Sequence, residues 1–133
     1  MRIDIVTPKG SILDTSATVV TVPSVLGEMG LMPGHLPIIA ALQPGRLTVE
    51  SAEGDHVFAV DRGFVEMARD HINVITEAAL KPDEIDIAQV KADRDAAIAA
   101  AKSEEGNATA QESRLLAERR AEALLAVAES AQS

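Results

Sequence analysis

Histidine and carboxylate side chains are the first candidates for acid–base or metal chemistry in this chain, and the sequence contains no cysteine, which excludes thiolate metal sites. The three histidines, His35, His56 and His71, have no sequence neighbours that suggest catalysis. Asp93 and Asp95 are carboxylates of the kind that bind metal ions. Side chains two residues apart on a helix point about 200° apart, however, so these two are poorly placed to share one ion. The sequence also lacks a nucleophile elbow, a phosphate-binding glycine loop and a zinc-binding His-Glu-x-x-His helix. We therefore expect no catalytic residue, no metal site and no cofactor.

Residues 27–37, which read GEMGLMPGHLP, are better suited to contact with another protein. Glycines permit backbone angles that other residues resist, and prolines fix φ, so we expect a rigid, exposed loop. Its apolar side chains either form a contact surface or tuck into the domain beneath it. Glu28 offers a charge for ion pairs, and His35 offers a group that donates a hydrogen bond or titrates near neutral pH. The candidate contact residues are Glu28, Met29, Met32, Pro33, Gly34, His35 and Leu36.

Basic side chains near the C-terminal end form a second candidate site. Arg114, Arg119 and Arg120 lie in a segment with helical periodicity. They either contact acidic groups of another protein or form ion pairs between residues four apart on a solvated helix. Arg114 and Glu118 have the spacing that the second interpretation requires.

Composition limits both the partners and the core. The net charge of −9 opposes binding to phosphate backbones and anionic lipids, so we expect no nucleic acid and no electrostatic docking on a membrane. Aromatic residues make up 2% of the chain, so the core must be built from Val, Ile, Leu and Ala. No apolar run approaches the ~18 residues that span a bilayer, and the start lacks the long apolar stretch of a signal peptide. We expect a cytoplasmic protein that reaches a membrane only through a partner.

The first 84 residues have the alternation and the turn residues of short β-strands. Residues 2–7 alternate and end at Pro8-Lys9-Gly10, while residues 17–22 are rich in β-branched side chains. Glu53-Gly54-Asp55 separates two alternating segments and predicts a hairpin. Strands punctuated this often indicate an antiparallel β-sandwich or flattened barrel. The predicted strands are residues 2–7, 17–22, 46–50, 56–60, 63–67 and 71–75.

Residues 85–133 have a different pattern, rich in alanine and free of proline and aromatic residues. Asp83 is the expected helix cap, with Asp86 in the weaker part of a capping box. We expect helices over about 84–102 and 109–129, joined by a short polar loop as an antiparallel hairpin. Their apolar stripes are largely alanine, which contributes far less than the ~1.5–3 kcal/mol of a buried Leu or Val. The hairpin is therefore either weakly held and able to detach, or simply a solvated appendage.

Residues 27–37, which we call the contact loop, and the segments around them resemble the epsilon subunit of F-type ATP synthase. That family carries the pattern Gly-Glu-x-Gly-x-x-Pro-Gly-His-x-Pro, which residues 27–37 match, followed by a stretch like residues 41–45. The segment 63–66, the pair Asn73-Val74 and the opening Val6-Thr7-Pro8 fit the family as well. The similarity covers the whole chain.

This resemblance implies a non-catalytic rotor subunit with an α+β fold. Residues 1–84 would form an antiparallel β-sandwich (a flattened barrel) that binds the gamma subunit and, through the contact loop, the ring of c subunits. Residues 85–133 would form a helical hairpin that folds against the sandwich or extends along gamma into the catalytic head. Extension would inhibit ATP hydrolysis, with Arg114, Arg119 and Arg120 facing the alpha and beta subunits. The complex would hold the chain at the cytoplasmic face of the bacterial plasma (inner) membrane.

Some bacterial members of that family bind ATP through the motif Ile-Asp-x-x-Arg-Ala at the start of the first helix. Residues 85–90 keep Asp86, but Gln89 and Val90 stand at the Arg and Ala positions. A neutral amide does not supply the bidentate, charge-assisted contacts of a guanidinium group. Asp86 is thus the candidate nucleotide-binding residue, and we expect ATP binding to be weak or absent.

A free-standing β-sandwich binding module with a helical tail is the alternative class. Such modules usually offer an aromatic platform or an open concave site. Phe58 and Phe64, the two aromatic residues of the chain, both fall in predicted strands, which argues against this alternative.

Overall fold

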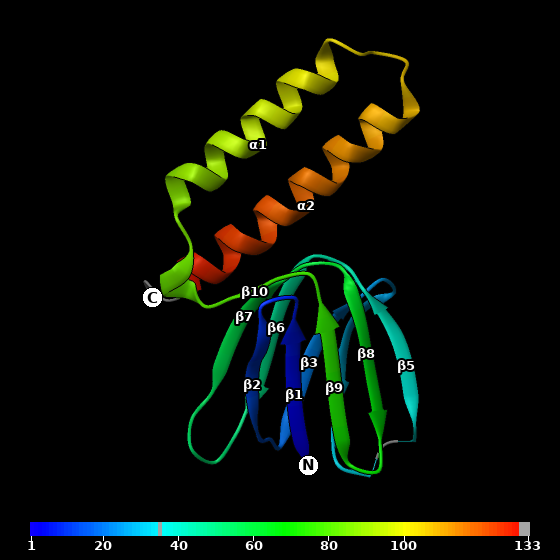
Figure 1. Ribbon diagram of the computed structural model, residues 1–133, viewed down its shortest axis with the longest axis vertical. Helices are drawn as coiled ribbons and strands as arrows, with labels where there is room; N and C mark the ends of the chain where they lie inside the picture. The colour runs from blue at the N-terminus through cyan, green and yellow to red at the C-terminus, as the bar shows by residue number, and fades with distance from the viewer. Residues whose placement is uncertain (35, 131–133) are drawn as a thin grey trace.

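The computed structural model describes residues 1–34 and 36–130. In these residues, ten strands form a flattened barrel, and two helices project from one end of it as an antiparallel hairpin (Figure 1). The N-terminus lies at the end of the barrel away from the hairpin. The predicted fold class, a β-sandwich followed by a two-helix hairpin, is confirmed. The elements are β1 (Arg2–Thr7), β2 (Gly10–Ser16), β3 (Val19–Ser24), β4 (Gly27–Leu31), β5 (Ile38–Leu42), β6 (Gly45–Glu50), β7 (His56–Val60), β8 (Gly63–Ala68), β9 (His71–Thr76), β10 (Ala79–Leu80), the 3-10 helix η1 (Pro82–Glu84), α1 (Ile87–Lys102) and α2 (Ala108–Ser130).

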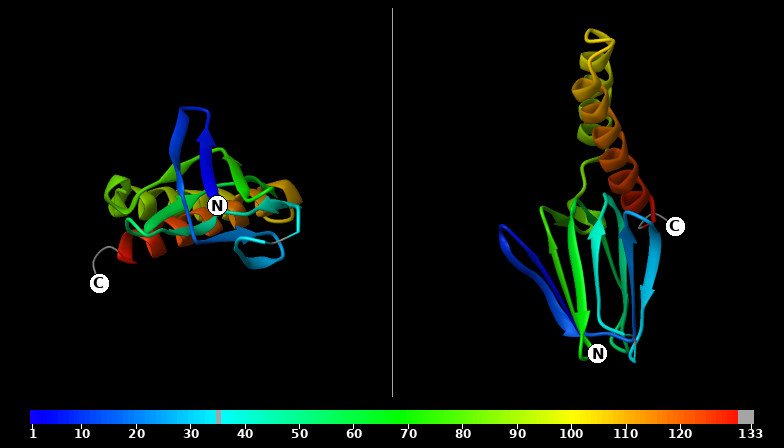
Figure 2. Two further views of the ribbon diagram at one scale, coloured as in Figure 1. Left: turned by 90° about the horizontal axis from the view of Figure 1, so that it is seen from below. Right: turned by 90° about the vertical axis from the view of Figure 1, so that its right-hand side faces the viewer.

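The strands pair in the order β10-β7-β6-β3-β5-β8-β9-β1-β2, and β4 adds to β3. Within the described residues, β1 and β9 are parallel and the other pairs are antiparallel. β3 and β5 pair through Ser24 and Leu42, and there the sheet folds into two layers. One layer contains β5, β8, β9, β1 and β2, and the other contains β3, β4, β6 and β7 (Figure 2).

Aliphatic side chains fill the space between the two layers. Phe58 is the one aromatic side chain in this core, so the predicted core of Val, Ile and Leu is confirmed. Each fully buried member stabilises the fold by roughly 1.5–3 kcal/mol. The core residues all precede η1, so the sandwich has a core of its own. The largest of them are Ile3, Ile5, Val20, Val22, Leu31, Leu47, Val49, Phe58, Val65, Met67, Ile72 and Val74.

The six predicted strands all occur, and the predicted hairpin joins β6 to β7. The prediction of a loop throughout residues 27–37 is wrong for Gly27–Leu31, which form β4 and pair with β3. Glycine is depleted in strands, and for that reason the sequence indicated a loop. Here the ladder with β3 and the burial of Leu31 outweigh that preference. The strands β2, β5 and β10 were not predicted.

The start of the first helix also differs from the prediction. Asp86, and not Asp83, caps α1, because its carboxylate accepts the Gln89 backbone N–H at 3.1 Å. Asp83 instead lies in η1, and Ile85 is extended between the two helices (φ −97°, ψ 122°). α1 therefore begins three residues later than predicted, whereas α2 extends one residue beyond the prediction at each end.

The hairpin packs on the sandwich through α2, which contacts β6, β7 and η1. Among the described residues, α1 fully buries only Ala101 and packs mainly on α2. The predicted thin apolar stripes are confirmed, and alanine removes little apolar area from water. Neither helix of the described chain is long and apolar enough to cross a membrane. The buried residues of α2 are Ala121, Ala123, Val127 and Ala128.

Candidate functional site

An apolar row crosses the solvent-facing side of β5, β8, β9 and β1, which we call the outer face. The strand register pairs Ala41 with Phe64, Phe64 with Ile75, and Ile75 with Val6. Phe64 and Ile75 are 60% and 61% exposed. These four residues line a shallow hollow of about 770 Å3. Contiguous apolar side chains left exposed on a regular sheet are typical of a protein-contact site.

The apolar surface continues along β5 toward the end of the barrel away from the hairpin. Ile39 lies two residues from Ala41, so it shares the outer face, and it is 72% exposed. Leu36, just before β5, is 85% exposed, and Met32 is 48% exposed. Met32 and Leu36 are thus candidate contact residues that the sandwich does not cover.

Sequence reasoning missed the apolar row. A signal was present, because β1, β8 and β9 each have one large apolar side chain among the alternate positions that are otherwise mostly polar. Phe64, for example, alternates in phase with Glu66 rather than with the buried Val65. Only the register across β1, β8 and β9 reveals that these residues lie side by side.

The second part of the contact loop lies at the end of the barrel where β8 turns into β9 (Figure 1). Gly34 has a left-handed φ of 87°, and its N–H donates to the Asp70 carboxylate at 3.2 Å. Asp70 and Arg69, which form the β8–β9 turn, also have left-handed φ values of 59° and 52°. Pro33 is exposed beside Gly34, and the candidate residue His35 lies outside the described residues.

The first part of the loop lies elsewhere. Glu28 is exposed on β4, opposite Pro23 and next to the β3–β4 turn, whose Leu26 is 97% exposed. Met29 is half-buried and packs against the core. The length of β4 separates Glu28 from Pro33 by about 15 Å. The structure therefore does not bring the candidate contact residues together into one loop surface.

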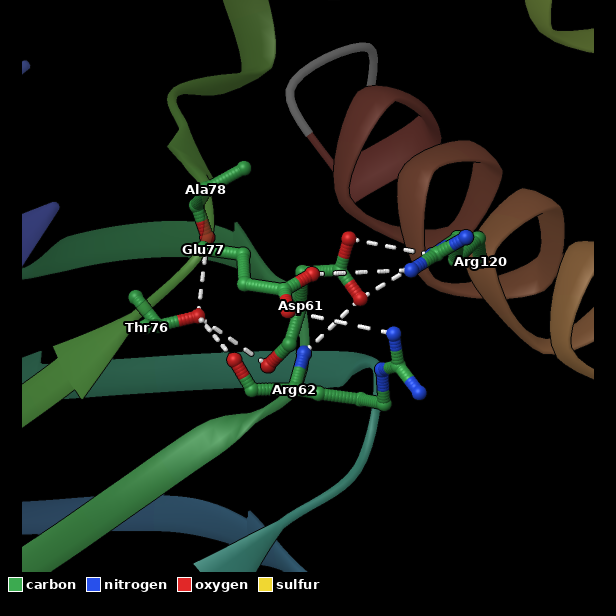
Figure 3. Close-up of polar contacts among 6 residues, drawn as sticks. All are labelled: Asp61, Arg62, Thr76, Glu77, Ala78 and Arg120. Carbon is green, nitrogen blue, oxygen red and sulfur yellow. Dashed lines mark hydrogen bonds and ion pairs between the residues drawn. The ribbon is translucent and has the colours of Figure 1, made fainter. Parts of the chain in front are cut away.

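An ion-pair cluster joins α2 to the sandwich near the hairpin end (Figure 3). The Arg120 Nε donates to the Asp61 carboxylate at 3.0 Å, and the Arg120 guanidinium lies 3.6 Å from the Glu77 carboxylate. The Asp61 side chain is 19% exposed, so this pair is better shielded from water than an ordinary surface pair. Glu77 also lies 3.8 Å from Arg62. We call Asp61, Glu77 and Arg120 the latch.

Hydrogen bonds and close packing inside the sandwich fix the position of Asp61, the latch residue that binds Arg120. The Asp61 carboxylate accepts the Arg62 backbone N–H at 2.8 Å. Gly63 allows β8 to approach β9 closely, because a Cβ there would lie 2.0 Å from the Ile75 carbonyl oxygen. The buried Thr76 hydroxyl lies within 3.2 Å of three carbonyl oxygens around this corner, those of Asp61, Arg62 and Ala78. Arg120 therefore binds a carboxylate whose position is already fixed.

The other two candidate arginines differ in what they contact. Arg119 hydrogen-bonds to the side-chain oxygen of Gln43, between β5 and β6, and so adds to the attachment of α2. Arg114 lies 3.7 Å from Glu118 on its own helix, which is the contact expected of a solvated helix. Two of the three candidates thus hold the hairpin down in this arrangement.

Replacing Arg120 with alanine is expected to loosen the hairpin. Loss of a charge-assisted, partly shielded contact costs about 1 kcal/mol, which corresponds to a roughly fivefold increase in opening. Hydrogen exchange of the α2 amides measures that opening. The matched control is Arg94→Ala, because Arg94 pairs with Asp95 on α1. Equal exchange of the α2 amides in the two variants would show that the latch does not hold the hairpin against the sandwich.

Asp86, the candidate nucleotide-binding residue, is engaged as the cap of α1. The Gln89 side chain donates to Asp93 at 2.8 Å, so it too is occupied on the helix surface. A hollow of about 260 Å3 between the two helices has Arg94 and Arg120 among its lining, but Asp86 is not part of that lining. Across residues 1–34 and 36–130, no group of three His, Asp or Glu side chains could hold a metal ion.

Known protein families and sequences similar to this chain identify the family to which it belongs. Residues 1–82 match the family model described as the β-sandwich domain of the ATP synthase delta/epsilon chain. The ATP synthase epsilon chain of Staphylococcus haemolyticus (strain JCSC1435) is 36% identical over 130 residues, covering 97% of this chain and 96% of the relative. That of Lawsonia intracellularis (strain PHE/MN1-00) is 36% identical over 97 residues, covering 73% of each chain. The chain belongs to the ATP synthase epsilon chain family, so the resemblance seen in the sequence is confirmed.

Two solved structures share the fold. A chain in the Euglena gracilis mitochondrial ATP synthase (OSCP, F1 and c-ring) matches with a TM-score of 0.80 at 23% identity, covering 93% of this chain and 78% of that chain. A chain in the central stalk and c-ring of the Tetrahymena thermophila enzyme matches with a TM-score of 0.64 at 15% identity, covering 96% of each. At these identities the likeness establishes the fold alone. The epsilon chain is a non-catalytic subunit, which confirms the expectation that this chain is not an enzyme.

Proposed function

We propose that this chain is a central-stalk subunit of an F-type ATP synthase that joins the gamma subunit to the ring of c subunits. The observation that carries the proposal is the exposed apolar row on the outer face, which remains uncovered although the sandwich has its own complete core. The two solved structures described above, which share this fold, come from ATP synthases.

Gamma docks on the outer face. Burial of apolar surface contributes about 25 cal/mol per Å2, and Phe64 and Ile75 offer the largest side chains of the row. A stable contact buries roughly 800 Å2 on each partner, which is more than one row supplies. The contact therefore extends along β5 through Ile39 to Leu36 and Met32, with Pro33 and Gly34 at its edge.

The c ring meets the other end of β4. Glu28 and Leu36 lie at opposite ends of β4, so we assign them to different partners. Glu28 lies beside the fully exposed Leu26, and its charge complements the basic side chains in the polar loops of the ring. An exposed ion pair contributes about 0–1 kcal/mol, so the affinity comes mainly from gamma.

The two parts of the chain have separate roles, the sandwich (residues 1–84) in docking and the hairpin (residues 85–133) in regulation. The alanine-rich contact of α2 and the partly shielded latch separate a folded and an extended hairpin by a few kcal/mol. Arg119 and Arg120 face the alpha and beta subunits only after they leave Gln43 and Asp61. Arg114 is available in both states. Extension then slows ATP hydrolysis.

The complex holds the chain at the membrane. Family members act within a membrane-associated enzyme, and the chain has no spanning helix in its described part. The similar epsilon chains from bacteria favour the cytoplasmic face of the bacterial plasma membrane as its location.

The test is the recovery of coupled proton pumping. Inverted membrane vesicles stripped of this subunit are expected to regain ATP-driven acidification when the chain is added. Glu28→Arg should lower that recovery, because it turns an attraction to the ring into repulsion. The control is Glu53→Arg, at the exposed β6–β7 turn. Equal pumping with both variants would contradict the assignment of Glu28 to the ring.

A further inference from the structure

We propose that the protein surface docking on the outer face carries an arginine or lysine side chain opposite Glu66, and that this ion pair helps to set the register of docking. The inference rests on the proposed function, because it takes the apolar row as the docking surface. It adds the chemistry of the partner: an apolar patch with a basic side chain about 7 Å from its centre, the spacing of two residues along a strand.

A second row crosses the outer face one step farther from the hairpin than the apolar row. The register pairs Glu66 with Ile39 on β5 and with Asn73 on β9, and it pairs Asn73 with Asp4 on β1. Glu66 is exposed and lies two residues from Phe64, so both side chains point to the same face.

The other carboxylates of this second row already have side-chain partners within the chain. Asp4 lies 2.7 Å from the His71 Nε2, and Asp14, which continues the row on β2, pairs with Arg2. The hydrogen bond from Arg2 holds the pKa of the Asp14 carboxyl below its ordinary value. Among the residues that the structure describes, no cationic group lies within ion-pair distance of Glu66. Among the described residues, Glu66 is thus the carboxylate of the row without an ion-pair partner.

A partner docked on the outer face would also cover the Glu66 side chain. The side chain stands between two exposed apolar groups, Ile39 across the strand pair and Phe64 along the strand. A surface that covers both therefore covers Glu66 as well. Loss of water around an unpaired carboxylate is costly, and a matching cation with hydrogen bonds removes that cost. The ion pair reinforces the apolar row in setting the register, because a shift of two residues along the strands would move the partner's cation away from Glu66.

The test compares binding of three full-length variants to a catalytic head that contains gamma but lacks this subunit. Glu66→Lys is expected to raise the Kd about 100-fold at low salt, where repulsion is least screened, and less at high salt. Glu66→Gln should raise the Kd about tenfold and reduce its salt dependence. The control is Glu53→Lys, which makes the same charge change in the exposed β6–β7 turn, outside the apolar row, and should leave the Kd nearly unchanged. All three substitutions are at exposed positions, and circular dichroism checks that each variant is folded.

The outcomes separate this inference from the proposed function. If Glu66→Lys binds like Glu53→Lys while Phe64→Asp fails to bind, the outer face is the docking surface and the ion pair is wrong. If both Glu66→Lys and Phe64→Asp bind like the unmodified chain, the docking face itself is wrong and this inference falls with it. Loss of binding in both, with a weaker salt dependence in Glu66→Gln, is the result that we expect.

Discussion

Phe64→Asp is expected to weaken binding to gamma by at least about 100-fold, a loss of roughly 2.7 kcal/mol. Aromatic anchors near the centre of an interface often contribute 2 kcal/mol or more, and Phe64 has Ala41 and Ile75 on either side. The aspartate would also bring an unpaired charge into an apolar contact. Because Phe64 is 60% exposed in the free chain, folding should be little affected. Calorimetric titration against a gamma-containing head measures the loss.

Leu115→Asp is the matched control for this experiment. Leu115 is 52% exposed on α2 and lies outside the outer face, so the substitution also replaces an exposed apolar side chain with a carboxylate but does not alter the outer face. Unchanged binding of Phe64→Asp, or equal losses in the two variants, would show that gamma docks elsewhere.

Removal of the hairpin is the second change with a large expected effect. A chain of residues 1–85 should still bind the catalytic head, because the sandwich core lies entirely before η1. The full chain is expected to slow ATP hydrolysis relative to the shortened chain by at least about fivefold, the lower end of ordinary regulatory coupling. The steady-state hydrolysis rate of heads lacking this subunit, with either chain added, measures the difference.

Asp61→Asn supplies the internal check on that result, because it removes the carboxylate of the latch and leaves Arg120 for contacts with the alpha and beta subunits. If the latch holds the hairpin down, this variant should inhibit hydrolysis more than the unmodified chain, because its hairpin extends more readily. Equal rates with the full and shortened chains would mean that the hairpin does not act as a brake. The chain would then serve only to connect gamma with the ring.

The sequence predicted the strands well wherever alternation was regular. β1, β8 and β9 each alternate between buried and exposed positions, and all three were predicted. β4 was missed because its glycines suggested a loop, and its strand conformation depends on pairing with β3. The helix cap moved from Asp83 to Asp86 because Ile85 is extended, a choice between two nearby carboxylates that local sequence does not decide.

The candidate site was less predictable because its parts are distant in sequence. The apolar row depends on the parallel pairing of β1 with β9, which brings Val6 beside Ile75. The latch joins residues 59 positions apart, and neither Asp61 nor Arg120 has a local pattern that points to the other. By contrast, Met32 and Leu36 were identified from residue type alone, since exposed apolar groups flanked by proline and glycine are informative without knowledge of the fold.

Binding of the full chain to catalytic heads prepared with and without gamma tests the central claim most directly. We predict a one-to-one complex that survives gel filtration when gamma is present, and no complex with the alpha–beta ring alone. In the complex, the amides around Phe64 and Ile75 should gain protection from hydrogen exchange. Separate elution of the chain from gamma-containing heads, or equal binding to heads that lack gamma, would contradict the account.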